Sequence, residues 1–192
     1  MRSRRKKKIV LASTSPRRKK LLKKICRSFQ VIPSHLDESK LKAKSPEGFA
    51  VKAAIAKAED IALKKRGTLV IGADTIVVLG KKILGKPKNK KDAIRMLKSL
   101  SGRIHQVITG IAIIDSETFK TSADYVVTKV QFKKLSDKTI FDYVQSGKPL
   151  DKAGSYGIQE IENEFGIEIK GDYNNVVGLP LKGLKKLLCQ VK

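Results

Sequence analysis

The chain has 192 residues, of which 41% are hydrophobic and 31% charged, and its formal net charge at pH 7 is +24. This length suffices for one sizeable core, and no apolar run approaches the roughly 20 residues of a membrane span. Without such a span or a secretory segment, we expect a soluble, cytoplasmic protein. Two histidines and two cysteines do not form a zinc-binding pattern.

Positive charge is spread over nearly every segment of the chain. Residues 1–8 are mostly basic, and we expect a disordered tail there, followed by a single domain over residues 9–192. The charge could attract nucleic acid, which is one hypothesis for function. However, the chain has only six phenylalanines, four tyrosines and no tryptophan, and it carries no RNA-binding or helix-turn-helix signature. We therefore expect no nucleic-acid partner.

The first predicted elements are a short buried strand at residues 9–11, a polar turn at 13–15 and a helix that begins at Pro16. This order directs backbone N–H groups and the positive end of the helix dipole towards one spot, which suits a phosphate. Arg17 and Arg18 lie in the first turn, where the dipole disfavours cations, so an anionic ligand would explain them. The alternative is a solvated helix start in a very basic protein.

A long alanine-rich helix is predicted next, with Ser45 as its N-cap and Pro46 as its first residue. Lys57 falls on the apolar face of this helix. A lysine there needs an anionic partner, or its stem runs along the small alanines to bring the amine to water; both interpretations stay open. Just upstream, Asp37 and Glu38 form an acidic pair that could bind a metal, although acids in loops beside helices commonly have no such role.

The most informative pattern begins with a strand from Thr68 that is predicted to end at Asp74. A hairpin-like stretch over residues 76–84 then returns the chain to Lys86, which Pro87 holds in a turn. An acid at a strand end with a lysine beside it suits a metal-bound phosphate. The carboxylate can hold Mg²⁺ or accept a proton from water, and the lysine can neutralise phosphate charge. Turn formation is the commoner role of such an aspartate.

The rest of the pattern alternates helices with strands and predicts an α/β domain. A helix capped by Asn89 is followed by strands at 103–115 and 119–132, a helix capped by Ser136, a short strand at 165–170 and a helix from Pro180. His105 lies in the first of these strands, and we interpret it as a structural, hydrogen-bonding histidine.

Seven segments, in order, resemble the Maf family of nucleoside triphosphate pyrophosphatases. They are LASTSPRRKKLL (11–22), VIPSHLDES (31–39), AAIAKAEDIA (53–62), GADTIVVLGKKILGKP (72–87), AIRMLKSLSGRIHQVITGIAI (93–113), DKAGSYGIQ (151–159) and GDYNNVVGLPL (171–181). The resemblance implies an α/β fold like that of inosine triphosphate pyrophosphatase, with a mixed sheet flanked by helices and two lobes around a cleft. It also implies a homodimer in nucleotide metabolism, with a house-cleaning role, that uses Mg²⁺ or Mn²⁺.

The activity implied by the resemblance is hydrolysis of a nucleoside triphosphate to its monophosphate and pyrophosphate, by metal-assisted attack of water on the α-phosphate. Asp74 matches the general base, and Glu38 and Asp74 match the metal site. The groups around the triphosphate are Ser13, Arg17, Lys57 and Lys86. Those associated with substrate choice are Arg17, Thr75 and Gln159. The tetrapeptide YGIQ at 156–159 is the form found in the subfamily that prefers dTTP and UTP.

One position departs from the family pattern. The family usually has a glycine after the glutamine, whereas this chain has Glu160. A carboxylate there could accept a hydrogen bond from the amino group of cytosine and so admit CTP. The family's link to septum formation gives an alternative function, a nucleotide-binding regulator of cell division with little turnover.

Overall fold

The computed structural model describes residues 7–162 and 164–191. Six of the eight residues of the predicted tail therefore lie outside the described residues. The last two have definite places. Lys8 is the first residue of strand β1 (Lys8–Leu11), and the amine of Lys7 lies 2.7 Å from the carboxylate of Asp115.

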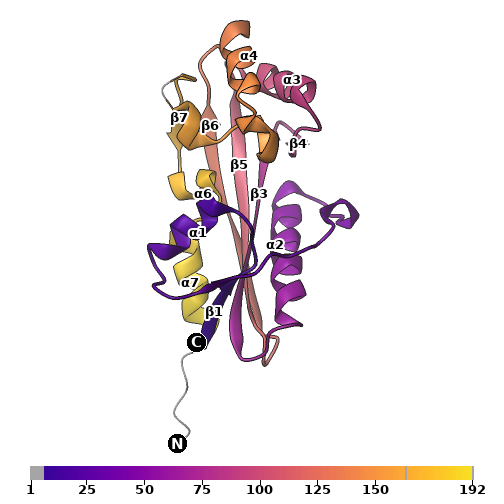
Figure 1. The fold of residues 1–192 in the computed structure, drawn as a ribbon, viewed down its shortest axis with the longest axis vertical. Coiled ribbons are helices and arrows are strands. Elements are labelled where there is room, and N and C mark those ends of the chain that lie inside the picture. Colours follow the sequence, from indigo (N-terminus) through magenta and orange to yellow (C-terminus); the bar gives the residue numbers. More distant parts are fainter. Residues whose placement is uncertain (1–6, 163, 192) are drawn as a thin grey trace, which may run out of the picture. The chain divides into compact units, whose positions relative to one another are not determined.

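The strands of the described residues form a mixed sheet in the order β2-β1-β3-β5-β6-β7, and β4 pairs with β3 (Figure 1). Strand β1 is parallel to β2 and β3, whereas β4 is antiparallel to β3 and β7 is antiparallel to β6. The other strands are β2 (Gln30–Val31), β3 (Thr68–Leu79), β4 (Lys82–Leu84), β5 (Ile104–Asp115), β6 (Thr121–Gln131) and β7 (Glu168–Lys170).

The helices are α1 (Pro16–Lys23), α2 (Pro46–Ala62), α3 (Lys90–Leu100), α4 (Asp137–Gln145), α5 (Ile158–Ile161), α6 (Tyr173–Val177) and α7 (Leu181–Val191). Three of them begin at the predicted caps: the side chains of Ser45, Asn89 and Ser136 each accept a hydrogen bond from the backbone N–H three residues further on. No helix in the described part of the chain is both long and apolar enough to cross a membrane.

The chain divides into two compact units. The first contains the residues up to 74, residues 109–125 and those from 178 onwards, and the second contains residues 75–108 and 126–177. The division falls between Asp74 and Thr75, in the interior of β3. The sequence indicated that the strand ends at Asp74, and this prediction is wrong, because Asp74 lies in the interior of β3. The apolar, mostly β-branched run at residues 76–79 continues the strand beyond it.

In the first unit, α2 lies on one side of the strands, and α1 and α7 lie on the other (Figure 1). The backbone of α2 comes unusually close to the strands at two glycines. A Cβ atom added to Gly72 on β3 would lie 2.0 Å from the carbonyl oxygen of Ala54, and one added to Gly110 on β5 would lie 2.2 Å from that of Ala50. Because only glycine permits this approach, these two positions set how closely α2 packs on the strands.

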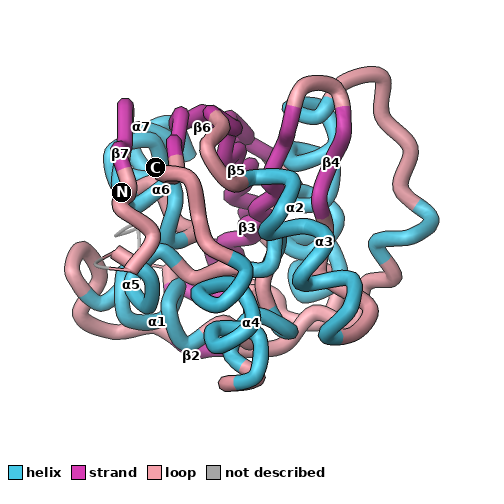
Figure 2. The backbone as a smooth tube through the Cα atoms, turned by 90° about the horizontal axis from the view of Figure 1, so that it is seen from above, coloured by secondary structure: helices cyan, strands magenta, loops and turns pink. Residues whose placement is uncertain are grey.

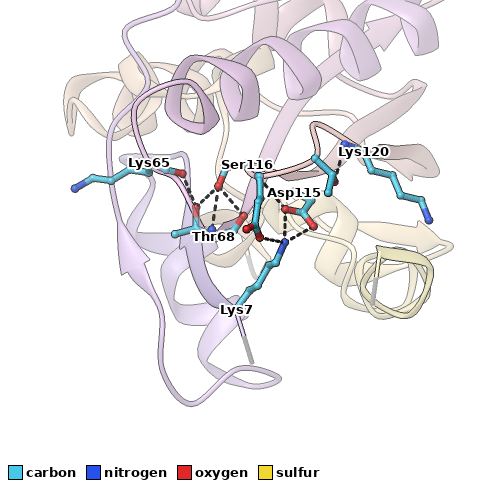
Figure 3. Close-up of polar contacts among 8 residues, drawn as sticks. Lys7, Lys65, Thr68, Asp115, Ser116 and Lys120 are labelled. Carbon is cyan, nitrogen blue, oxygen red and sulfur yellow. Dashed lines mark hydrogen bonds and ion pairs between the residues drawn. The ribbon is translucent and has the colours of Figure 1, made fainter. Parts of the chain in front are cut away.

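A network of hydrogen bonds and ion pairs lies at the start of β3 in the same unit (Figure 3). The backbone N–H of Thr68 donates to the hydroxyl of Ser116 at 2.9 Å, and that hydroxyl donates to the carbonyl of Thr68 at 3.0 Å. Beside it, Lys7 pairs with Asp115 and with Glu117, whose carboxylate is 2.8 Å from the amine. Burial raises the pKa of Asp115, but its hydrogen bonds with Lys7 and the N–H of Glu117 outweigh burial and lower that pKa overall.

In the second unit, α3 packs beside α4 (Figure 2). An aromatic cluster forms part of the core, where the buried ring of Phe132 meets the rings of His105, Tyr156 and Phe165 edge-on. The Nε2 atom of His105 lies 2.7 Å from the hydroxyl of Tyr156, and burial lowers the pKa of the imidazole to about 4. These contacts agree with the structural role that we expected for His105.

Candidate active site

In the first unit, Lys57 joins the two predicted metal ligands. Its amine lies 2.6 Å from Oδ1 of Asp74 on β3 and 2.7 Å from Oε1 of Glu38, which begins a short 3₁₀ turn at Glu38–Lys40. The side chain of Lys57 is 14% exposed, that of Asp74 is 7% exposed and that of Glu38 is 43% exposed. The interpretation that Lys57 has an anionic partner is therefore confirmed, and a partly buried ammonium holds two carboxylates together.

The second carboxylate oxygen of Asp74 has a different environment. Oδ2 is buried and accepts no hydrogen bond from the residues that the structure describes. A buried carboxylate oxygen normally has a partner, so an unpaired one is consistent with a ligand-binding or catalytic position. One oxygen of Asp74 is thus fixed by Lys57, and the other can accept a proton or bind a cation.

The donor set around Lys57 is compatible with a hard divalent cation. Asp74 and Glu38 supply carboxylate oxygens, and the unpaired Oδ2 is a ready ligand. Among the described residues, no group of three or more histidine, cysteine, aspartate or glutamate side chains could hold a metal. Two carboxylates suit Mg²⁺, which usually keeps several waters and binds substrate phosphates as well.

The turn between β1 and α1 brings further polar groups into the first unit. Ser13 is buried, and its hydroxyl accepts hydrogen bonds from the N–H of Ser15 at 3.2 Å and from Nη1 of Arg18 at 3.4 Å. Arg18 also donates from Nε to the carbonyl oxygen of Gly178 at 2.8 Å. Arg17, one position earlier on α1, is half-buried.

Arg18 is a residue that the predicted site did not include. Burial lowers the pKa of its guanidinium, while the charges of Asp74 and Glu38 raise it. Arg18 therefore interacts electrostatically with the same two carboxylates that contact Lys57. The sequence contained a signal for it, since both arginines lie in the first helical turn, but the periodicity did not indicate that Arg18 contacts Ser13 and Gly178.

The other predicted site residues belong to the second unit. Thr75 follows Asp74 on β3 and is half-buried, Lys86 is exposed in the loop after β4, and Gln159 is exposed on α5. The loop before Lys86 is tied down, because the N–H of Gly154 donates to the carbonyl of Gly85 at 3.0 Å.

Glu160 has internal partners that the sequence did not reveal. Its Oε2 accepts a hydrogen bond from the hydroxyl of Tyr143 at 2.9 Å, and its Oε1 lies 3.1 Å from the amine of Lys152. Both carboxylate oxygens therefore contact the protein itself. These contacts fix the position of the carboxylate, and the expectation that it accepts a hydrogen bond from the amino group of a cytosine stays a prediction.

Comparison with known proteins agrees with the sequence motifs. A family model described as Maf-like protein matches residues 8–191. The dTTP/UTP pyrophosphatase of Clostridium botulinum (strain Kyoto / Type A2) is 47% identical over 189 residues, which are 96% of this chain and 97% of that protein. The dTTP/UTP pyrophosphatase of Acetivibrio thermocellus is 48% identical over 188 residues, or 94% of each chain.

Two solved structures resemble the fold. A HAM1 protein from Coxiella burnetii superposes with a TM-score of 0.53 at 17% sequence identity, over 96% of this chain and all of the other. The Ham1 protein of Staphylococcus aureus gives a TM-score of 0.51 at 19% identity, over 97% of this chain and all of the other. The likeness confirms the predicted fold class, a mixed α/β fold of the Maf and Ham1 type.

Proposed function

Because this chain belongs to the Maf family, we propose that it is a nucleoside triphosphate pyrophosphatase that converts dTTP and UTP to the nucleoside monophosphate and pyrophosphate. The observation that supports the proposal best is the different environment of the two carboxylate oxygens of Asp74. One of its oxygens is bound by Lys57, and the other is buried without a hydrogen bond from the described residues. This carboxylate stands in a chain about half identical, over nearly its full length, to proteins that carry the name of this activity.

In the proposed reaction Asp74 is the general base. Lys57 holds Oδ1 and so restricts rotation of the carboxylate, which leaves Oδ2 to take a proton from water. The resulting hydroxide oxygen bonds to the α-phosphorus, and the bond from that phosphorus to the oxygen bridging the α- and β-phosphates breaks. The electron pair of that bond leaves with pyrophosphate.

The phosphates require positive groups and hydrogen-bond donors. In the first unit we assign this role to Arg17 and to Ser13, whose hydroxyl lies in the turn before α1, and we add Arg18, which contacts that hydroxyl. Lys57 is the fourth such group, because its ammonium has three donors and can bind a phosphate oxygen while it still holds Oδ1 of Asp74. For Lys86 in the second unit, phosphate binding stays a prediction.

A divalent cation, Mg²⁺ or Mn²⁺, would be held by Asp74 and Glu38. When bound, it polarises phosphoryl oxygens and offsets their charge. Its binding can be measured without turnover, by calorimetric titration of the protein with MgCl₂ or MnCl₂. We expect Glu38→Gln to weaken binding, and Asp137→Asn, which changes an exposed acid of the second unit, to leave it unchanged. Equal binding by both variants would contradict the proposed ligands.

We assign base selection to Gln159, together with Arg17 and Thr75. A glutamine amide both donates and accepts, so it can pair with part of the acceptor–donor–acceptor edge of uracil or thymine. Cytosine has an amino donor in place of the O4 acceptor. An amide set for O4 would then be left unpaired, which costs about 1–3 kcal/mol or roughly 10- to 100-fold in kcat/KM.

The test is pyrophosphate release by the purified protein from UTP, dTTP, CTP, GTP and 7-methyl-GTP, with Mg²⁺ and with Mn²⁺. We expect UTP and dTTP to be the best substrates and Gln159→Ala to reduce their advantage over CTP. A preference for 7-methyl-GTP would contradict the assignment to the subfamily that prefers dTTP and UTP. Tight UTP binding without turnover would favour the alternative function, a nucleotide-binding regulator of cell division. The expected homodimer and cytoplasmic location stay predictions, for sedimentation velocity and cell fractionation respectively.

A further inference from the structure

The short helix α5, which carries Gln159, is held in two different ways. Ile158 and Ile161 are buried and bind it to the core of the second unit through apolar contacts, which have no preferred direction. The helix has only four residues and no side-chain N-cap, so its own hydrogen bonds cannot fix its orientation. Directional contacts must come from elsewhere, and Glu160 makes them.

Glu160 lies between two buried groups that fix both of its oxygens. Lys152 is 7% exposed, and its amine also contacts the carbonyl oxygen of Lys148 at 2.5 Å and the carboxylate of Asp151 at 2.7 Å. The hydroxyl of Tyr143 donates to Glu160 and accepts the N–H of Gly157 at 3.2 Å. Tyr143 thus joins Glu160 directly to the residue that precedes α5.

The turn into α5 is packed against the same groups. A Cβ atom on Gly157 would lie 2.7 Å from Cε of Lys152 and 3.1 Å from the carboxyl carbon of Glu160, so both side chains rest on the Gly157 backbone. Burial raises the pKa of Tyr143, and its hydrogen bond to Glu160 raises it further, so the hydroxyl remains a donor. The network therefore constrains the residues on both sides of Gln159.

We propose that Glu160 is a positioning residue for base selection, which fixes the orientation of α5, and with it the amide of Gln159, through its bonds to Lys152 and Tyr143. This inference rests on the proposed function, in which Gln159 contacts the base. The chain thus has a partly buried ionic contact at the position where its family usually has glycine. Glu160 itself does not touch the substrate.

The experiment separates this role from a general effect on stability. The variants are Glu160→Gln, which keeps the size but removes the charge, Tyr143→Phe, which removes one hydroxyl, and the double variant. Glu164→Gln is the matched control, because it makes the same chemical change at an exposed glutamate four residues further on. For each protein we would measure the thermal midpoint, kcat and KM for UTP and CTP, and the calorimetric Kd of the α,β-methylene analogues of both nucleotides.

We expect the UTP preference, as a ratio of kcat/KM and as a ratio of Kd, to fall about 10-fold in each single variant. The loss should lie in KM for UTP, with kcat nearly unchanged, because Asp74 is untouched. The double variant should lose less than the product of the two single losses, since both substitutions act on the position of the same side chain. An unchanged ratio in Glu160→Gln, with or without a lower thermal midpoint, would overturn the proposal, as would an equal fall in Glu164→Gln.

The binding ratios keep this test independent of turnover. If the wild-type protein releases no pyrophosphate from any nucleotide, the proposed function is wrong. The two Kd ratios would then still decide whether Glu160 controls the choice between uracil and cytosine.

Discussion

The close approach of α2 to β3 can be tested with one methyl group. In Gly72→Ala, the new Cβ atom would lie 2.0 Å from the carbonyl oxygen of Ala54 and 3.0 Å from the backbone nitrogen of Ala58. Real Cβ atoms essentially never approach other heavy atoms closer than 3.0 Å, so helix and strand must separate by roughly 1 Å at this point. Neither neighbour can yield by a rotamer change, because both contacts are to backbone atoms.

The displacement has two expected consequences. Forcing a methyl group into a packed interface costs about 1–3 kcal/mol of the free energy of unfolding, and each kcal/mol lowers the thermal midpoint by about 2–4 °C for a domain of this size. The same movement shifts Lys57, which lies on α2 between Ala54 and Ala58, away from Asp74, two residues after Gly72. Because a misplacement of about 1 Å can lower turnover about 10²-fold, we expect activity to suffer as well.

Urea unfolding and UTP turnover measure the two effects separately. The control for stability is Gly85→Ala, since a Cβ atom there would meet nothing within 4 Å. We expect Gly85→Ala to keep the wild-type unfolding midpoint and Gly72→Ala to lower it. Wild-type stability and turnover in Gly72→Ala would refute the close packing of α2 on β3 and its role in placing Lys57.

Three other outcomes follow from individual contacts. Asp74→Asn should lower turnover by about 10²–10⁴ while the protein keeps its fold and unfolds cooperatively, as measured by pyrophosphate release and calorimetry. Lys57→Met should raise KM for UTP and cost about 3 kcal/mol of stability, since it leaves the buried Asp74 carboxylate without its cation; unchanged urea unfolding would contradict that contact. The pKa of His105 is lowered to about 4 from about 6.5 in the unfolded chain. The unfolded chain therefore binds the extra proton between these values, and His105 should cost the folded state up to about 3 kcal/mol as pH falls from 7 to 4. His105→Gln should flatten this part of the stability–pH curve, and an unchanged slope would refute the burial effect.

The sequence predicted helices well where a capping residue marks the start of the helix. Ser45, Asn89 and Ser136 are caps in the structure because a side-chain hydroxyl or amide before a helix satisfies an otherwise free N–H. The short helices α5 and α6 were not predicted, since four or five residues are too few to display a period. Their existence depends on tertiary contacts.

The candidate site was predictable in its residue types but not in its pairings. Helical periodicity placed Lys57 on a buried face and required an anionic partner, yet it could not name Asp74, seventeen residues away. That pairing depends on the register between α2 and β3, which Gly72 sets through a backbone contact with Ala54. The available signal was a glycine inside an apolar strand, which commonly marks a close approach of another backbone. The contact of Glu160 with Tyr143 and Lys152 had no local signal at all.

The charge of +24 and the candidate site have different physical roles. Around Asp74, positive and negative side chains lie close together: Lys57 contacts Asp74 and Glu38, and these two carboxylates and Arg17 all act on the charge of Arg18. Diffuse surface charge acts over a Debye length of about 8 Å at physiological salt, so it can raise the rate of encounter with a nucleotide but cannot distinguish one base from another. The cluster around Asp74, with its unpaired carboxylate oxygen, has the opposite properties. It adds little to long-range attraction, and it holds a proton acceptor in one place. The chemistry that we propose therefore depends on the positions of these few groups, and the excess of lysine elsewhere could be reduced without loss of kcat.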